Sequence, residues 1–350
     1  MVRSITRMGA VSAVMLAVVG VLALAIPVQG APAESPSWLD PTLLAAAKKE
    51  GTITVYSSIN QAESLELWAP FEQASGIKVN YIIAGDPLLM GRIIVEARAG
   101  KENWDLIVST IGDELPRERL AQYEPPQASG LIPAARDPGK RWYGVYANYS
   151  APAYNTQMIK AADLPKTYED FLKHPEWAGH VGISKDDTQW MAAMVQYYGE
   201  AKAKKLLSDI VAKLHPATVN SHIALARAVG AGEYWLALNN AASLTMNVNL
   251  TGAPTDFFVI EPVANYFGLE SINAKAPHPN AARLAANFLI SREGQKGVVD
   301  HGRFPTRTDV PTNPVGVLEP FKGKKIIPIH LVIAVGQSMD KMFKDIFNAR

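Results

Sequence analysis

The chain has 350 residues, with 34 Lys and Arg against 33 Asp and Glu and a formal net charge of +1. That balance argues against a nucleic acid or an anionic membrane surface as partner. Hydrophobic residues make up 48% of the chain, which supports a packed core and argues against disorder. The absence of cysteine excludes a disulfide framework and lipid attachment through an N-terminal cysteine.

The first thirty residues resemble a secretory signal peptide. Arg3 and Arg7 supply a positive start, residues 8–26 are apolar and uncharged, and residues 28–31 include the small side chains of a cleavage site. We therefore expect export of a mature chain that starts near Ala31. Because the apolar run is long, an uncleaved membrane anchor is the alternative. No later apolar run approaches the length of a bilayer span.

The next part of the chain alternates helices and strands. Asp40 is placed to cap the start of the first helix and Gly76 to cap the end of the second. The hydrophobic spacing predicts helices over residues 41–50, 63–76 and 88–99, and strands over residues 51–56, 77–83 and 104–109. This order predicts a parallel sheet with right-handed crossovers and helices on both faces.

The pattern changes from residue 143 onward. Strands are predicted over residues 143–149, 152–155, 182–184, 217–219, 234–239 and 257–261. Helices are predicted over residues 165–172, 188–199, 201–214, 221–231, 279–291 and 332–348. A second α/β unit therefore occupies the middle of the chain, and the chain then returns to the first unit. Two such connections imply a hinge, and a cleft between lobes is a common ligand site.

We divide the chain accordingly. Residues 1–30 are the expected signal peptide, and residues 31–47 are a linker with the start of the first helix. The first lobe is expected to contain residues 48–147 and 257–320, and the second lobe residues 148–256 and 321–350.

Polar side chains follow the predicted strands at the ends where helices begin. In sheets of this kind ligands bind at the carboxyl ends of the strands, beside helix N-termini. The candidate ligand-binding residues are Ser57, Ser58, Asn60, Asp86, Ser109, Thr110, Asp187, Thr188, Gln189, Asn220, Ser221, Asn239 and Asn240, with Tyr149 as an aromatic surface for stacking. Hydroxyl and N–H groups there favour a carboxylate or phosphate-like group. The alternative is that each polar residue is only a helix cap, and Asp86 and Asp187 would also suit an amine.

Signals of catalysis are missing from the sequence. The seven histidines have no metal-site spacing, and no Gly-x-Ser-x-Gly elbow occurs. Asp186 and Asp187 are adjacent at a predicted helix start, which is typical of a cap and its neighbour. We therefore predict a protein that is not an enzyme and that needs no cofactor. A structural or adhesive protein is disfavoured by the two-lobed pattern with a polar cleft.

A series of motifs in this order resembles a known family. The motifs are GTITVYSS (51–58), GIKVNYIIAG (76–85), WDLIVS (104–109), YGVYANYSAPAYN (143–155), WAGHVGISKDD (177–187), GEYWLALNN (232–240) and PHPNAARLAANFLIS (277–291). Together they resemble the periplasmic solute-binding proteins of ABC transporters, in the group that includes ferric-iron-binding proteins, over about residues 48–310. The resemblance implies a type 2 periplasmic binding fold, in which two α/β lobes with mixed, mostly parallel sheets enclose a cleft. It also implies a periplasmic monomer whose partner is an ABC permease in the inner membrane.

The ferric members of that group hold iron with two adjacent tyrosines after the strand that matches residues 234–239. Asn239, Asn240, Ala241 and Ala242 stand at the matching positions here, and the first loop contains no histidine. Fe(III) needs anionic oxygen donors, which amides and methyl groups do not supply. We therefore predict a small, polar and acidic organic solute and no metal ligands. The alternative is ferric iron held with a synergistic anion and without the tyrosine pair.

One other tyrosine pair exists, at Tyr197 and Tyr198. It lies inside a predicted helix, where neighbouring residues point in different directions. We predict that one ring lies in the core and the other at the surface.

Overall fold

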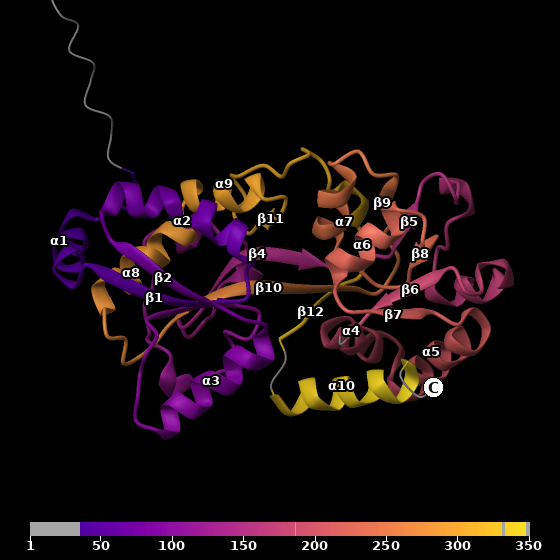
Figure 1. Cartoon of the computed structure of the whole chain (residues 1–350), viewed down its shortest axis with the longest axis horizontal. Helices are drawn as coiled ribbons and strands as arrows, with labels where there is room; N and C mark the ends of the chain where they lie inside the picture. Colours follow the sequence, from indigo (N-terminus) through magenta and orange to yellow (C-terminus); the bar gives the residue numbers. More distant parts are fainter. Residues whose placement is uncertain (1–35, 186, 331–332, 348–350) are drawn as a thin grey trace, which may run out of the picture. The chain divides into compact units, whose positions relative to one another are not determined.

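The chain builds two separate β-sheets, each flanked by helices (Figure 1). This computed structural model describes residues 36–185, 187–330 and 333–347, so the expected signal peptide lies outside the described residues. Within those ranges the first sheet has seven strands and the second has five. Both sheets mix parallel and antiparallel pairings. The predicted two-lobed α/β architecture is confirmed.

The first sheet starts from the elements that the sequence predicted. They are α1 (Pro41–Glu50), β1 (Thr52–Ser57), α2 (Gln61–Ser75), β2 (Lys78–Ile83), α3 (Asp86–Arg98) and β3 (Leu106–Ser109). Strand β1 pairs in parallel with both β2 and β3, as expected. Both predicted caps are present, because the Asp40 side chain accepts a hydrogen bond from the Leu43 N–H at 2.6 Å and Gly76 has a left-handed φ of 73°.

The centre of the first sheet is a long strand that the sequence did not reveal. Strand β10 (Val263–Ile272) lies between β3 and β4 (Tyr143–Tyr149) and is antiparallel to both. The strand predicted over residues 257–261 is wrong, because β9 (Thr255–Phe257) ends where that prediction began. Strand β10 is buried along almost its whole length, so it lacks the alternation of a half-buried strand.

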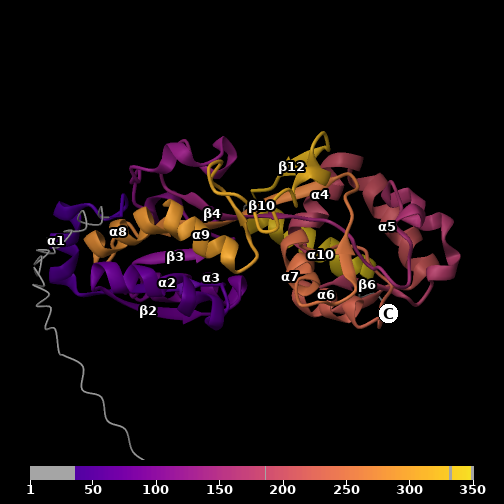
Figure 2. The ribbon, with the colours of Figure 1, turned by 90° about the horizontal axis from the view of Figure 1, so that it is seen from above.

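Two short strands complete the first sheet, and two helices follow β10 in the chain. The strands are β11 (Phe304–Pro305) and β12 (Ile326–Pro328), which pairs with β10 although residues 321–350 were expected in the second lobe, and the helices are α8 (Pro279–Leu289) and α9 (Arg292–Asp300). In Figures 1 and 2, β4 and β10 lie side by side, in agreement with their pairing.

The second sheet has the order β7-β6-β8-β5-β9. Its strands are β5 (Ala153–Asn155), β6 (Val181–Ser184), β7 (Ala217–Val219), β8 (Leu236–Ala237) and β9. Its helices are α4 (Thr188–Tyr198), α5 (Glu200–Leu214), α6 (His222–Gly230), α7 (Ala242–Asn249) and α10 (Ile333–Phe347). Helix α7 was not predicted, and β8 is shorter than the predicted strand over residues 234–239.

Short 3-10 helices connect these elements. They are η1 (Arg117–Arg119), η2 (Ala128–Gly130), η3 (Pro133–Ala135), η4 (Ala161–Asp163), η5 (Tyr168–Lys173), η6 (Pro175–Trp177) and η7 (Glu319–Phe321). The helix predicted over residues 165–172 is η5, which starts at a capping box formed by Thr167 and Asp170.

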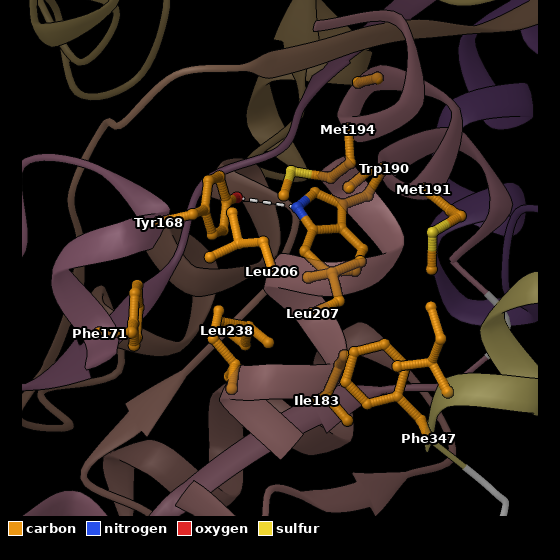
Figure 3. Packing of buried hydrophobic residues seen from close by; sticks show 14 of the residues in the cluster. Tyr168, Phe171, Ile183, Trp190, Met191, Met194, Leu206, Leu207, Leu238 and Phe347 are labelled. Carbon is orange, nitrogen blue, oxygen red and sulfur yellow. Dashed lines mark hydrogen bonds between the residues drawn. The ribbon is translucent and has the colours of Figure 1, made fainter. Parts of the chain in front are cut away.

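The core of the second lobe surrounds Trp190 of α4 (Figure 3). The Trp190 side chain is fully buried, and its indole N–H donates a hydrogen bond to the Tyr168 hydroxyl at 2.8 Å. Phe343 and Phe347 of α10 belong to the same cluster, so the C-terminal helix packs against α4 and α5. Trp190 is therefore a core residue.

The tyrosine pair of α4 divides as predicted. Tyr198 packs against this core, whereas Tyr197 is 41% exposed. Their hydroxyls donate hydrogen bonds to different carboxylates, Tyr197 to Glu261 at 3.1 Å and Tyr198 to Glu169 at 2.8 Å.

Glu270 of β10 is a buried acid with both carboxylate oxygens free of hydrogen bonds among the described residues. Burial raises its pKa well above the ordinary value. The folded state therefore binds a proton that the unfolded state releases near pH ~4.5, so this group loses its contribution to stability as the pH rises above that value.

We expect Glu270→Gln to remove this pH dependence. The stability of the variant relative to the wild type should rise by about 1.4 kcal/mol per pH unit from roughly pH 5 upward, until the pKa of the folded protein is reached. Urea unfolding of both proteins from about pH 5 to about pH 8 measures the difference. A difference that does not change with pH would contradict the assignment of a neutral Glu270.

Candidate ligand-binding cleft

A cavity of about 440 Å³ is lined by residues of both lobes. Its volume lies within the range of roughly 300–1,000 Å³ that is usual for small-molecule sites. The first lobe contributes the loop after β1, the start of α2 and the segment after α9, and the second lobe contributes α6 and α7. The lining residues are Ser58, Asn60, Ala62, Glu63, Glu66, His301 and Arg303 on the first side, and Ile223, Arg227, Leu244, Asn247, Val248 and Thr251 on the other.

The first-lobe wall is built around Arg303. Its side chain is only 13% exposed, and its guanidinium donates two hydrogen bonds to Glu63, the one from Nη2 to Oε2 measuring 3.0 Å. The same guanidinium lies 4.2 Å from the centre of the Tyr146 ring. Burial by itself would lower the pKa of Arg303, but Tyr146 and Glu63 hold it above the ordinary value. Arg303 is therefore a fixed, permanently charged group at the cavity wall.

Tyr146 occupies its place because residue 268 is glycine. A Cβ atom on Gly268 of β10 would fall 2.0 Å from the Tyr146 ring. The ring therefore lies directly over the neighbouring strand. Burial raises the pKa of Tyr146, although Arg303 opposes this.

Tyr266 of β10 marks where the two lobes approach each other. Burial raises the pKa of Tyr266 well above the ordinary value, and the charges of Asp187, from the second lobe, and Asp86, from the first, raise it further. Asp86 and Asp187, two candidate residues from different lobes, therefore both raise the pKa of the Tyr266 phenol.

The first-lobe candidates divide into two groups. Ser58 and Asn60 line the cavity. Ser57 is buried, and its hydroxyl accepts a hydrogen bond from the Ile59 N–H at 3.1 Å.

Asp86, Ser109 and Thr110 bond to one another. The Ser109 hydroxyl donates to Asp86 Oδ1 at 2.5 Å, and the Thr110 hydroxyl donates to Asp86 Oδ2. The loops after β2 and β3 therefore meet, as predicted. The two hydrogen bonds between them occupy both carboxylate oxygens of Asp86.

Asp187 and Asn239 form a buried scaffold in the second lobe. Asp187 caps α4 by accepting from the Trp190 N–H at 3.0 Å, and it also accepts from Asn239 Nδ2 at 2.9 Å. Asn239 Oδ1 accepts from the Ser184 N–H at 2.7 Å. These side chains hold the ends of β6, β8 and α4 together.

The remaining polar candidates of the second lobe differ in burial. Asn240 is buried, and its Nδ2 has no partner among the described residues. Asn220 and Ser221 are exposed, and Ser221 caps α6 by accepting from the Ala224 N–H at 3.3 Å.

Thr188 and Gln189 lie at the start of α4. Gln189 and Thr110 line a small cavity of about 10 Å³, room for about one water molecule, together with Glu114. Burial, with Asp113 and Asp86 nearby, raises the pKa of Glu114 to about 7.

The Tyr149 ring is not free to stack on a ligand. It packs against Phe304 and Phe321, with ring centres 6.0 Å and 5.1 Å apart. Both of its neighbours belong to a buried cluster that also contains Ala242 and Met246 of α7.

Sequence reasoning missed Glu63, Arg227, Tyr266 and Arg303. Arg303 and Glu63 are 240 positions apart, and no motif or periodicity links them. Only contact between α2 and the α9 segment brings them together.

The described residues contain neither a cluster of metal ligands nor a membrane-spanning helix. Within residues 36–185, 187–330 and 333–347, no three or more His, Cys, Asp or Glu side chains are grouped as metal ligands. In the same ranges, no helix is both long and apolar enough to cross a bilayer.

Solved structures share this fold. Iron-bound HitA from Pseudomonas aeruginosa superposes with a TM-score of 0.70 at 23% identity, covering 84% of this chain and 99% of HitA. AfuA from Actinobacillus pleuropneumoniae, with fructose-6-phosphate bound, has a TM-score of 0.70 at 19% identity, covering 86% of this chain and 100% of AfuA. The fold thus serves chemically different ligands.

Relatives identified by sequence indicate the same kind of protein. Iron uptake protein A1 of Synechocystis is 25% identical over 283 residues, which are 75% of this chain and 77% of that protein. Residues 120–324 match the family model described as bacterial extracellular solute-binding protein. The chain therefore belongs to the bacterial extracellular solute-binding proteins, as the motif order predicted.

Proposed function

We propose that this solute-binding protein of an ABC import system captures a small, polar and acidic organic solute in the 440 Å³ cavity. The observation that carries the proposal is that one cavity has walls from both lobes, with Arg303 fixed in one wall. A ligand that touches both walls adds contacts that only the closed state makes, so binding stabilises closure. The closed form then delivers the solute to a permease in the inner membrane. Binding without catalysis, periplasmic location, cleavage of the leader near Ala31 and a monomeric state belong to the same proposal.

The hinge of this proposal lies where β4 and β10 continue into the second lobe. The Ser150 N–H donates to the Ala264 carbonyl at 2.8 Å, and the Ala264 N–H donates to the Ser150 hydroxyl at 2.8 Å. These bonds keep the two connecting segments together as they cross. The proposed lobe boundaries at residues 147/148 and 256/257 lie close to them.

Ser58→Ala should weaken ligand binding by roughly tenfold without unfolding the protein, whereas Thr188→Ala, outside the lining of this cavity, should bind as the wild type does. The Ser58 change removes a hydroxyl whose hydrogen bond to a charged oxygen contributes about 1.5–3 kcal/mol. The ligand released from gently purified protein, identified by mass spectrometry, serves as the calorimetric titrant. Lys204→Ala, on an exposed part of α5, is the control and should bind as the wild type does. Wild-type affinity in Ser58→Ala, or lost affinity in Thr188→Ala, would place the ligand elsewhere.

Ferric iron with a synergistic anion is a second candidate, because two similar proteins are named for iron. Besides the Synechocystis protein, the Fe(3+)-binding periplasmic protein of Serratia marcescens is 28% identical over 163 residues, covering 44% of this chain and 47% of that protein. This candidate would use few protein ligands.

Titration of apo protein with ferric citrate should produce no tyrosinate-to-iron absorption band. Ala241 and Ala242 are buried where the phenols would stand, and burial raises the pKa of both Tyr146 and Tyr266, which opposes phenolate formation. Visible spectra alongside metal analysis measure this. A tyrosinate band would contradict this expectation, and one iron retained per chain without such a band would favour the second candidate over the first.

A further inference from the structure

The second-lobe wall of the cavity combines an apolar surface with one arginine. Ile223 and Arg227 are four residues apart on α6 and therefore share a face. Leu244 and Val248 have the same spacing on α7. This wall consequently presents three aliphatic side chains next to a guanidinium.

Arg227 is the arginine of this cavity that no carboxylate of the described residues contacts. Arg303 is paired with Glu63, and His301 lies 3.6 Å from Glu66. The Arg227 side chain is exposed and makes no hydrogen bond or ion pair with any residue that the structure describes. A ligand in this cavity therefore meets a guanidinium whose N–H groups are free to bind an anion.

We propose that the ligand is an aliphatic monocarboxylate, whose carboxylate pairs with Arg227 and whose hydrocarbon part lies against Ile223, Leu244 and Val248. This inference rests on the proposed function and narrows its substrate class. A bare inorganic oxyanion satisfies Arg227 but leaves the aliphatic wall in water. An uncharged apolar molecule covers the wall but leaves the arginine unpaired. A carboxylate with a hydrocarbon chain satisfies both, because arginine pairs well with planar carboxylates.

Chain length gives a direct test. Calorimetry or thermal-shift titration of the wild-type protein with acetate, butanoate and hexanoate, and with inorganic phosphate, measures the preference. Each buried methylene should tighten binding about fourfold, so hexanoate should bind about fifteenfold more tightly than butanoate. Equal affinity across the three acids, or stronger binding of phosphate than of hexanoate, would overturn the proposal.

Substitutions separate the two parts of the wall. Arg227→Gln should weaken hexanoate binding at least tenfold, and Arg227→Lys should retain part of the affinity because it keeps the charge without the paired geometry. Leu244→Asn should reduce the dependence on chain length while leaving acetate binding unchanged. Arg98→Gln removes an exposed arginine at the far end of α3 and serves as the matched control.

The outcomes also separate this proposal from the proposed function. If the ligand released from the protein is acidic but binds equally to the wild type and to Arg227→Gln, the monocarboxylate inference fails and the receptor function stands. If the released ligand has no acidic group, the proposed function fails as well.

Discussion

Replacement of Glu63 by glutamine should lower the free energy of unfolding by about 3–5 kcal/mol. Glu63 is the carboxylate that holds the buried Arg303, and Asn60 Nδ2 also donates to it at 3.0 Å. Removing its charge leaves a guanidinium that is 13% exposed without a counterion. The loss of stability comes from the buried, unpaired charge of Arg303 rather than from the lost attraction between Glu63 and Arg303.

Urea unfolding followed by circular dichroism measures the change. The double variant Glu63→Gln, Arg303→Met should recover much of the loss, because neither charge is then left buried alone. Glu66→Gln is the matched control, since Glu66 is exposed on the same helix and its stability should change by about 0.5 kcal/mol or less. If Glu63→Gln is as stable as the wild type, water reaches Arg303 more freely than its burial indicates.

Trp190→Ala should also cost about 3–5 kcal/mol, because it removes a fully buried indole ring of the second lobe and leaves a cavity. Figure 3 shows the ring surrounded by side chains that include Tyr168, Leu206, Leu207 and Phe347. The same substitution should loosen α10, since Phe347 packs in this cluster.

Tyr168→Phe separates the polar part of that effect from the packing. It keeps the ring but deprives the Trp190 indole N–H of its acceptor, which should cost about 1–3 kcal/mol. Tyr197→Phe removes an exposed hydroxyl on the same helix and should change stability by about 0.5 kcal/mol or less. Thermal and urea unfolding of the three variants give the comparison. Equal stability of Tyr168→Phe and Tyr197→Phe would contradict a role for the buried hydrogen bond.

Elements with strong local signals were predictable from the sequence. The first three helices and strands follow from hydrophobic spacing and from caps such as Asp40 and Gly76, and their order was enough to predict the parallel part of the first sheet. Local patterns work here because a cap and a periodic face depend on residues a few positions apart.

Strand β10 and helix α7 were not predictable in the same way. Strand β10 is buried and carries Asn265, Glu270 and Ser271, so its sequence shows neither clean alternation nor an apolar run. Helix α7 has Thr245 and Val248 among polar residues, which weakens its helical signal, and packing against α6 and β9 stabilises it instead.

For the site, the sequence determined which loops carry polar groups, and the tertiary structure decided which of those groups remain available to a ligand. Asp86, Asp187 and Asn239 use their hydrogen-bonding capacity within the protein, because buried polar atoms are costly unless they are paired. Ser58 and Asn60 remain at the cavity, joined by Arg303 and Arg227 from distant segments. Such contacts between remote residues arise only when helices and strands pack, so no pattern along the chain encodes them.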